Sequence, residues 1–576
     1  MFPRMITFLI AYGFIATIAF KFGTSYLSLP KDIFGSYEKR NAQSSCEHDP
    51  IPHVQPKAGT WLGWGADVYN TRWASDDSTI SSASVSSLRP VCELQYSLGV
   101  SAAPLVENNM AYYPTHDGLL VALQFTSCVV TWQVNITDII AKYKPVPANL
   151  EVVIRKMSRT TPVTDGDNLY VGTQANALLL AIHKHSGKLL DVLQISEHPA
   201  AILTQSPTFY KGIILIGVSS LEELLQLFDP DYPCCTFTGS MNAVIMTPDG
   251  LELLWTQKMA PTALGWSGSS IWGSQPAIDP IRRQVFIATG NTYRAPNSFS
   301  ECQNQTANID GLESNACLPS DVYQESILAL DLESGRINWV KQVNPVDVWN
   351  VACPNPVGNA TKDRAELCPD PGPDFDFAMA PTFVRGSKHT PYQLDMIVVG
   401  QKSGALYALN AMSGSVLWQT ITSPGGLTGG LSWGIAVDDS TVYYTAINSL
   451  QVKYILPGGK TSIQNSAFGA ASLVDGHIIW QAAAPRGKMS RVPPTVVNDI
   501  VLTGVTGEYT DALGNMSQSG TLIALDQRSG ALIREYPLGG WFGGGIAVVY
   551  NYVMFGTGYS SLYPSSGSFH VWNFDR

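Results

Sequence analysis

Charged residues are scarce in this 576-residue chain, at 14% of the total, and basic residues are outnumbered by acidic ones, 35 against 46. The net charge of −11 argues against nucleic acid or an anionic membrane surface as a partner, because both attract basic proteins. No C-x-x-C-H motif occurs, so covalently attached haem is not supported. The nine histidines form no spaced pair typical of a metal site.

Long apolar runs are absent after residue 20. The one such run, Ile6–Phe20, follows Arg4 and stops at Lys21. It is typical of a signal-peptide core, because a full membrane span needs about 20 residues. No clear small-x-small cleavage site follows, so an uncleaved membrane anchor is the open alternative. We therefore expect a signal peptide or anchor at 1–30, a linker at 31–58, and a protein that is secreted or anchored facing the secretory lumen or exterior.

Glycosylation sequons and cysteines agree with an oxidising compartment. Four N-x-S/T sequons suggest a eukaryotic secretory route; they begin at Asn135, Asn304, Asn359 and Asn515. The nine cysteines are typical of a disulfide set rather than a metal cluster. The expected pairs are Cys302 with Cys317, Cys353 with Cys368, and Cys92 with Cys128, which leaves Cys46 odd.

Cys234 and Cys235 are adjacent, which makes them the most unusual cysteines of the chain. Neighbouring Cα atoms lie about 3.8 Å apart across a trans peptide, whereas a relaxed disulfide spans roughly 4.4–6.8 Å. A bridge between them would be strained, and strained features tend to persist where a site uses them. Such a ring would be a flat, rigid cover for a planar ligand. The alternative is two ordinary cysteines, one or both paired elsewhere.

A repeated turn motif organises the chain. With 50 Gly, 36 Pro, 24 Tyr and 14 Trp, the composition favours many short strands joined by tight turns. The clearest copies are Ile327–Trp339, Leu406–Trp418 and Leu522–Arg534, and weaker ones are Ala122–Trp132, Ala181–Asp191, Ala243–Trp255 and Ala470–Trp480. In the clearest copies Asp or Asn opens the turn and Gly supplies a positive φ, and the Trp or its substitute anchors one sheet on the next.

An eighth copy, Phe569–Phe574, ends where its last strand should begin, so that strand must come from elsewhere. The aromatic stretch Thr60–Gly65 is the expected source. Seven full repeats and one split repeat predict an all-β fold, an eight-bladed β-propeller over 59–576 that is closed by pairing of the N- and C-terminal strands.

The tandem Ala-x-Asp-x-x-Ser-Gly-x-x-x-Trp turns resemble those of quinoprotein alcohol dehydrogenases, which use pyrroloquinoline quinone. Three motifs resemble the polyvinyl-alcohol-dehydrogenase-like branch: Cys-Cys-Thr-Phe-Thr-Gly-Ser from Cys234, Trp349–Cys353, and Pro371–Phe377. The resemblance runs from about Trp61 to the end. It implies that the cofactor lies at the centre of the ring with a calcium ion against it.

The resemblance assigns the cofactor's polar contacts. The segments Thr204–Pro207 and Gly217–Glu222 match the family's cofactor segment. By that match Thr204 and Ser219 would bind cofactor carboxylates and Glu222 would ligate the metal. Arg159 matches the arginine that meets a carboxylate.

The same resemblance implies the flat surfaces and the remaining charges. Trp272 would be the floor on which the quinone stacks, and the Cys234–Cys235 bridge would be the ceiling. Asn291 would be the second metal ligand, consistent with the preference of calcium for carboxylate and amide oxygens. Lys402 would lie near the quinone oxygens, where it and the metal would make the quinone a better hydride acceptor.

The chain departs from the family at the catalytic base. Where methanol-oxidising relatives have an Asp that accepts the substrate proton, this chain has Asn350, and an amide cannot act as a base. Asp347 is the nearest substitute, and Glu222 is a second candidate. We therefore expect Asp347, Asn350 and Lys402 to be the catalytic residues.

Three function classes follow. The favoured one is an exported alcohol dehydrogenase that oxidises a small or polymeric alcohol, such as a small intermediate of a specialised pathway, and passes electrons to an external acceptor. The alternative is a non-catalytic propeller scaffold that has lost the cofactor. A sugar hydrolase or lyase would need paired carboxylates, for which only Asp374 and Asp376 are suggestive.

Overall fold

The computed structural model describes residues 58–74, 78–229, 232, 234–306, 316–343, 345–351, 353, 372–510, 516–559 and 566–574. The predicted segment 1–30 and all but the last residue of the predicted linker lie outside these ranges, as do Cys46 and Cys368. Among the described residues, no helix is long and apolar enough to cross a membrane.

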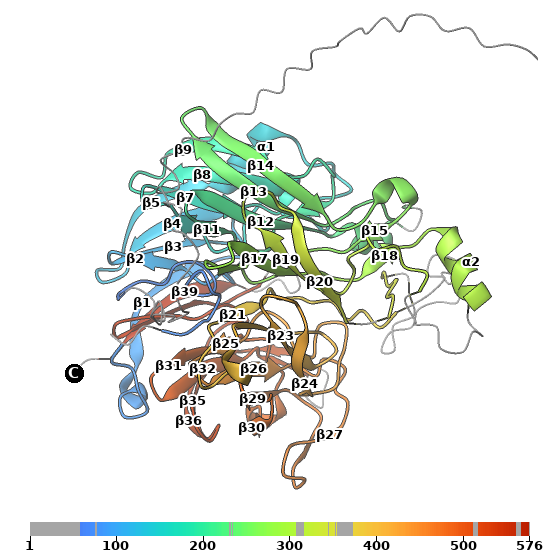
Figure 1. Ribbon diagram of the computed structural model, residues 1–576. Coiled ribbons are helices and arrows are strands. Elements are labelled where there is room, and N and C mark those ends of the chain that lie inside the picture. The colour runs from blue at the N-terminus through green and yellow to red at the C-terminus, as the bar shows by residue number, and fades with distance from the viewer. Residues whose placement is uncertain are drawn as a thin grey trace, which may run out of the picture. The chain divides into compact units, whose positions relative to one another are not determined.

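Eight antiparallel sheets follow one another along the described chain and are arranged around a ring, seven of four strands and one of five (Figure 1). The first four sheets consist of β2 (Leu105–Glu107), β3 (Met110–Pro114), β4 (Leu119–Gln124) and β5 (Val129–Asn135); β6 (Val163–Thr164), β7 (Asn168–Gly172), β8 (Leu178–His183) and β9 (Leu189–Gln194); β10 (Ala201–Ile202), β11 (Thr208–Tyr210), β12 (Ile213–Ser220), β13 (Ser240–Thr247) and β14 (Gly250–Lys258); and β16 (Ala277–Asp279), β17 (Gln284–Ala288), β19 (Ser326–Asp331) and β20 (Ile337–Gln342).

The last four sheets consist of β21 (Thr382–Val384), β22 (Met396–Gly400), β23 (Ala405–Asn410) and β24 (Val416–Ile421); β25 (Ala436–Val437), β26 (Thr441–Ala446), β29 (Ala467–Ser472) and β30 (Ile478–Ala483); β31 (Thr495–Val497), β32 (Ile500–Val505), β35 (Thr521–Asp526) and β36 (Leu532–Pro537); and β37 (Ala547–Val549), β38 (Tyr552–Gly556), β39 (Gly567–Asn573) and β1 (Arg89–Tyr96). The first strands of neighbouring sheets contact one another: β16 contacts β21, and β25 contacts β31. These first strands therefore line the centre of the ring.

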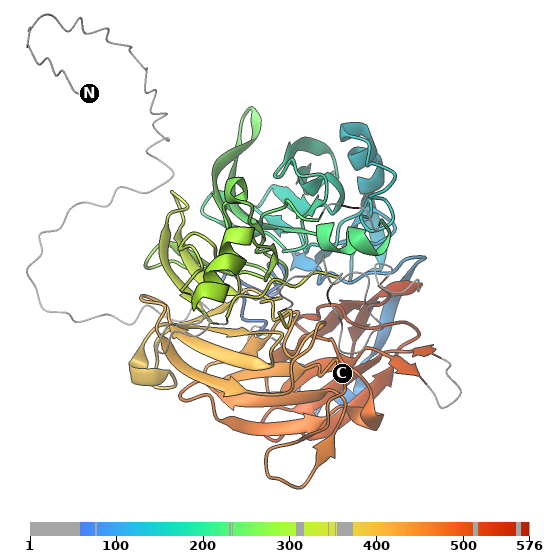
Figure 2. The same cartoon turned by 90° about the vertical axis from the view of Figure 1, so that its right-hand side faces the viewer.

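The remaining elements are small. Two-stranded ribbons are formed by β15 (Ser267–Gly268) with β18 (Thr292–Arg294), β27 (Tyr454–Ile455) with β28 (Ser462–Ile463), and β33 (Glu508–Thr510) with β34 (Met516–Gln518). The described α-helices are α1 (Ile136–Tyr143), directly after β5, and α2 (Asn297–Thr306), between β18 and β19 (Figure 2). The short 3-10 helices are η1 (Val85–Ser87), η2 (Ala175–Ala177), η3 (Glu222–Leu227), η4 (Thr262–Leu264), η6 (Pro391–Gln393) and η7 (Pro485–Gly487).

The ring closes through the two ends of the chain, as predicted, but not through the predicted segment. β1 pairs antiparallel with β39, from Arg89 opposite Asn573 to Tyr96 opposite Gly567. The prediction that Thr60–Gly65 supplies this strand is wrong. Trp61 makes only an isolated bridge to Val106 of β2, because the chain around it bends at Gly63 and Ala66, whose φ angles are +97° and +74°.

Residues 60–74, which we call the plug segment, instead run across the first strands of several sheets. Backbone N–H groups of these sheets donate to successive plug carbonyls; the pairs are Ile278 to Val68, Phe383 to Tyr69, Val437 to Thr71, and Val496 to Arg72. The Arg72 guanidinium is fully buried and donates to the Pro494, Trp64 and Ile546 carbonyls and to Thr495 Oγ1; these bonds satisfy a cation that burial would otherwise destabilise. The plug segment therefore fixes the centre of the ring.

The repeat motif joins each sheet to the next, which confirms the anchoring role predicted for its Trp. Trp418 lies opposite the small Ala408 in its own sheet, and its Nε1 donates to Leu473 O of the following sheet at 2.9 Å. Its ring covers Gly476, where φ is +71° and an added Cβ would lie 2.4 Å from the ring. The same arrangement of Trp over the next turn's Gly recurs for Trp132 on Gly187, Trp255 on Gly335, Trp339 on Gly414 and Trp480 on Gly530.

Replacing Trp418 with Phe should lower the free energy of unfolding by about 1–2 kcal/mol, because the Leu473 carbonyl loses its donor and part of the apolar contact is removed. Urea unfolding of the wild type and variant measures this difference. Tyr392→Phe is the control, since Tyr392 is 89% exposed and its variant should unfold like the wild type. Equal stability of W418F and Y392F would contradict the anchoring role.

Two predicted disulfides are confirmed, Cys92–Cys128 and Cys302–Cys317. Cys353 is disulfide-bonded, and its predicted partner Cys368 lies outside the described residues. The sequon residue Asn135 is exposed and caps α1 by accepting from Asp138 N. Asn359 and Asn515 lie outside the described residues, and the side chain of Asn304 is likewise not described.

Candidate active site

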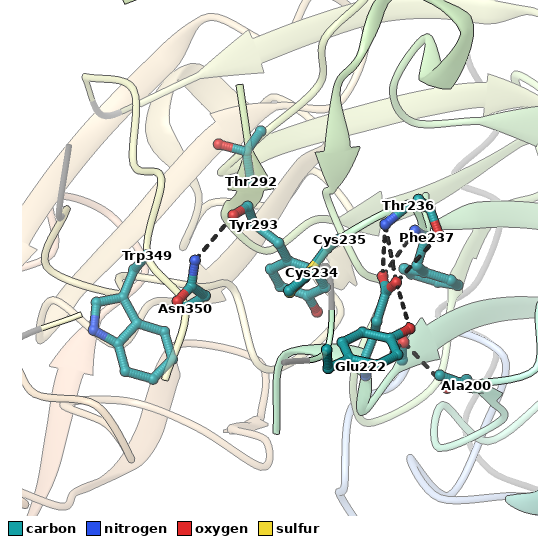
Figure 3. Close-up of a disulfide and its surroundings, with 12 residues drawn as sticks. Ala200, Glu222, Cys234, Cys235, Thr236, Phe237, Thr292, Tyr293, Trp349 and Asn350 are labelled. Atoms are coloured by element: carbon teal, nitrogen blue, oxygen red, sulfur yellow. Dashed lines mark hydrogen bonds between the residues drawn. A yellow bond between two sulfur atoms is a disulfide. The ribbon is translucent and has the colours of Figure 1, made fainter. Parts of the chain in front are cut away.

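Cys234 and Cys235 form a disulfide with each other across a cis peptide bond, which decides between the two predicted alternatives (Figure 3). The pair lies in the loop between η3 and β13. Cys235 belongs to a hydrophobic cluster that includes Tyr293, and Cys234 and Trp272 both pack against this cluster. The proposed floor and ceiling residues thus lie against one cluster of apolar side chains.

Glu222 follows β12 and begins η3, and its side chain is fully buried. Its two carboxylate oxygens accept from the backbone N–H of Thr236 at 2.9 and 3.0 Å and of Phe237 at 2.8 Å. They also accept from the Tyr232 hydroxyl at 2.9 Å and the Thr236 hydroxyl at 3.2 Å, and His198 Nε2 lies 3.6 Å away. Figure 3 shows this carboxylate directed at the loop that carries the disulfide.

These donors keep Glu222 ionised. Burial alone would raise the pKa of Glu222, but the hydrogen bond from His198 and those from the Phe237 and Thr236 backbone hold it below the ordinary value. The carboxylate is therefore the charged anchor of the loop at 232–237.

Glu223, the next residue, was not singled out by the sequence. Burial raises its pKa to about 8; the negative charges of Asp376 and Asp347 act in the same direction, and Lys402 opposes them. The charges of Asp376, Asp347 and Lys402 thus act on the pKa of Glu223. Two adjacent glutamates give no signal in the sequence for which of them faces the centre.

Lys402 is the cation of this set. Its Nζ contacts Asp374 at 2.9 and 3.1 Å and Asp376 at 2.7 Å, and all three side chains are largely buried. Burial alone would lower the pKa of Lys402, but the two carboxylates outweigh it and raise the pKa. Burial also raises the pKa of Asp374 well above its ordinary value, against the opposing effect of Lys402.

Asn291 is joined to the same set through Asp376. Its backbone N–H donates to Asp376 Oδ1 at 2.7 Å. Its side-chain Nδ2 donates to the carbonyls of Trp349 at 2.8 Å and Thr292 at 3.0 Å, and the residue is buried. Because both bonds fix the nitrogen side of the amide, Oδ1 is directed away from those carbonyls and is available as an acceptor.

Asp347 and Asn350 lie on the loop after β20. Asp347 is buried, accepts from Phe375 N at 3.0 Å, and shares a hydrogen bond with the side chain of Glu325. Burial raises the pKa of Asp347, and its hydrogen bonds with Glu325 and with the Phe375 backbone oppose this effect. Asn350 Nδ2 donates to Tyr293 O at 3.3 Å, so its amide lies beside the disulfide cluster (Figure 3).

Thr204 and Ser219 are joined to Trp272. The Thr204 and Ser219 hydroxyls lie 2.8 Å apart, and Thr204 Oγ1 donates to Trp272 O at 2.7 Å. The Trp272 ring lies over Gly290, where an added Cβ would be 3.0 Å from Nε1. Within the described part of the chain, this indole N–H has no hydrogen-bond partner.

Thr204 also lines a small cavity that is partly open to solvent. Arg159 lies in its wall, hydrogen-bonded to the Tyr559 hydroxyl and with its guanidinium carbon 5.6 Å from the Trp433 ring centre. Trp541 and the plug residue Trp64 complete its aromatic lining. The sequence analysis missed Trp433, Trp541 and Tyr559, whose only signal is an aromatic residue in a Gly-rich connection.

The structure therefore brings the predicted site residues into two connected groups. Trp272, Thr204, Ser219 and Arg159 adjoin the cavity or its wall, whereas Asn291, Lys402, Asp347 and Asn350 adjoin the disulfide cluster and the buried charges. Their roles toward a cofactor stay predictions. Over the described residues, no group of three or more His, Cys, Asp and Glu side chains is arranged to hold a metal by itself, so a metal here would also need the Asn291 amide or a cofactor oxygen.

Comparison with known proteins shows what this chain is similar to. A family model described as outer membrane protein assembly factor BamB matches residues 323–545. A polyvinylalcohol dehydrogenase of a Pseudomonas species is 28% identical over 445 residues, 74% of this chain and 60% of the relative. One from Sphingopyxis sp. strain 113P3 is 25% identical over 412 residues, 69% of this chain and 56% of the relative. The chain thus spans less than two thirds of the length of these relatives.

Among solved structures, a quinohemoprotein alcohol dehydrogenase from Comamonas testosteroni matches with a TM-score of 0.64 and 14% identity, covering 90% of this chain and 80% of that one. At this identity the match concerns the fold, and it confirms the eight-bladed propeller. The names of the curated relatives confirm the resemblance to quinoprotein alcohol dehydrogenases and to their polyvinyl-alcohol branch.

Proposed function

We propose that this chain is a quinoprotein alcohol dehydrogenase that oxidises an alcohol to a carbonyl compound with pyrroloquinoline quinone and calcium. The observation that supports this most is the packing of Trp272 and the Cys234–Cys235 disulfide against one cluster, beside the buried charges around Lys402. The relatives named for alcohol oxidation support the same reaction class.

The residues present fit this cofactor. A planar trianion needs cations and hydroxyl donors at its rim and flat surfaces above and below. Arg159, Thr204 and Ser219 offer the cation and the hydroxyl groups. Trp272 and the disulfide offer the flat surfaces. Arg159 and Thr204 also line one cavity, together with Trp64, Trp433 and Trp541. The amide oxygen of Asn291 and the neighbouring carboxylates are donors that calcium prefers.

When bound, the quinone would accept the hydride of the alcohol, with the metal as a Lewis acid. The chain itself would orient the alcohol, hold positive charge at Lys402 and accept the alcohol proton at Asp347. A base with a raised pKa suits this task near neutral pH, and Asp347 has such a pKa because it is buried. Asn350, with its nitrogen fixed on Tyr293 O, would position the hydroxyl group rather than accept its proton.

The setting of the reaction is part of the proposal. A signal peptide or anchor at 1–30 would export the protein, and an exposed Asn135 is compatible with glycosylation. The substrate would be a small alcohol of a specialised pathway or a polymeric one, and an external acceptor would take the electrons. Retention of Trp272, Asn291 and Lys402 at one place argues against a scaffold that has lost its cofactor.

Dye reduction tests this function. The purified full chain is supplied with pyrroloquinoline quinone and calcium, and reduction of an artificial dye is followed across primary and secondary alcohols. We expect reduction that requires the alcohol, the quinone and the metal together. A rate that is independent of all three, or no reduction with any alcohol, would remove the oxidoreductase assignment in favour of the scaffold.

A further inference from the structure

We propose that the metal carboxylate of this site is Glu223, and that Glu222 instead anchors the loop carrying the Cys234–Cys235 disulfide. The inference rests on the proposed quinoprotein function and assigns residues of this chain within it. It reverses the assignment that the sequence resemblance gives to two adjacent glutamates.

The oxygens of Glu222 are already engaged by the protein. A carboxylate has about four lone-pair sites, and five hydrogen bonds from Tyr232, Thr236 and Phe237 reach the two oxygens of Glu222. A calcium ion binds its oxygens at roughly 2.3–2.6 Å and would have to displace several of these donors. One of the donors is the backbone N–H of the buried Phe237, which would then lose its acceptor.

These same bonds define what Glu222 does. The five hydrogen bonds come from Tyr232, Thr236 and Phe237, and the disulfide lies between the first and the last of these residues (Figure 3). His198 Nε2 lies 3.6 Å from the same carboxylate. The side chain therefore ties the end of β12 to the disulfide loop. A positioning role accounts for all of its contacts.

Glu223 points elsewhere because η3 is a 3-10 helix. With three residues per turn, neighbouring side chains leave such a helix about 120° apart, so Glu223 cannot share the direction of Glu222. The charged groups that act on Glu223 most strongly are Asp376, Lys402 and Asp347, in that order, whereas Glu222 is the weakest of the four.

Asp376 connects this position to the second expected ligand. Its Oδ1 accepts from Asn291 N at 2.7 Å and its Oδ2 contacts Lys402 Nζ at 2.7 Å. Asn291 thus contacts Asp376, whose charge also raises the pKa of Glu223, and the Asn291 amide oxygen is directed away from the carbonyls that its nitrogen binds. Carboxylates gathered with a single lysine repel one another, and a divalent cation between Glu223 and Asn291 would offset that repulsion.

Calcium binding to matched variants tests the assignment. The wild type, Glu222→Gln and Glu223→Gln are dialysed with pyrroloquinoline quinone at several free calcium concentrations, and bound calcium per chain is measured. We expect E223Q to weaken calcium binding at least tenfold, and Glu223→Asp, which keeps a shorter carboxylate, to bind with intermediate affinity. E222Q should bind calcium within about threefold of the wild type.

The disulfide loop provides the second readout. We expect E222Q to speed reduction of the Cys234–Cys235 bridge by a thiol reagent several-fold, and E223Q to leave that rate unchanged without metal. Loss of calcium binding in E222Q with normal binding in E223Q would overturn the assignment, as would equal binding in both variants. If the wild type bound no calcium, the metal site of the proposed function would be wrong as well. A normal quinone-dependent rate of dye reduction would then show that only the metal part of the proposed function was wrong.

Discussion

Replacing Lys402 with alanine is expected to lower the free energy of unfolding by about 3–5 kcal/mol and to remove most alcohol oxidation. The Lys402 ammonium is the partner of two largely buried carboxylates, Asp374 and Asp376, and removal of one member of a buried ionic set leaves uncompensated charge. The same substitution would remove the positive charge expected at the quinone oxygens, an electrostatic effect of about 10²–10³ in kcat. Urea unfolding and dye reduction measure the two effects.

The stability loss in Lys402→Ala should depend on pH. Without the lysine, Asp374 binds a proton more readily in the folded than in the unfolded chain, because burial raises its pKa and no cation opposes that effect. The loss should therefore be smallest near about pH 4, where the unfolded chain is also protonated, and should grow as the pH rises. Lys156→Ala is the control: Lys156 pairs with Glu151 at the surface at 2.8 Å, so its loss should stay below about 1 kcal/mol. Equal losses in the two variants would contradict the account of the buried charges.

Replacing Asp347 with asparagine is expected to lower kcat by about 10²–10⁴ while the protein stays folded, since an amide keeps the shape but cannot accept the alcohol proton. Wild-type kcat should rise with pH as Asp347 loses its proton, over a range above the ordinary range for an aspartate because burial raises its pKa. Steady-state dye reduction from acidic to neutral pH measures both quantities. A flat profile in the variant is the expected signature.

Asn350→Ala is the matched comparison for Asp347→Asn. Asn350 lies on the same loop and donates to Tyr293 O, so its loss should disturb substrate position and lower kcat far less than D347N does. If D347N kept the kcat of the wild type, the base would be another carboxylate, and Glu223 would be the next residue to test.

The propeller could be predicted because its signal is local. The turn with Gly, the small Ala and the Trp opposite it recur in most copies, and these positions make the contact between sheets, as Trp418 does over Gly476. The closing strand could not be assigned from composition. Thr60–Gly65 is more aromatic than Arg89–Tyr96, but its bends at positive φ prevent regular pairing, and only the fold shows that the plug segment crosses the centre.

The site was predictable to the level of segments but not of individual side chains. Sequence spacing identified the segment around Glu222, yet the direction of each glutamate depends on η3 and on donors 10 to 15 residues away. Asp374 and Asp376 were assigned to a loop motif, and the structure shows them holding Lys402. Trp433 and Tyr559 around Arg159 come from distant parts of the chain, which no local pattern connects.

Direct binding of pyrroloquinoline quinone tests the central claim most simply. Titration of the full chain with the quinone in the presence of calcium, followed by calorimetry and by quenching of tryptophan fluorescence, measures the stoichiometry and the affinity. The account predicts one quinone per chain, bound at least tenfold more weakly by Trp272→Leu and no more weakly by the distant W418F variant. Absence of saturable binding, or equal affinity in W272L and the wild type, would contradict it.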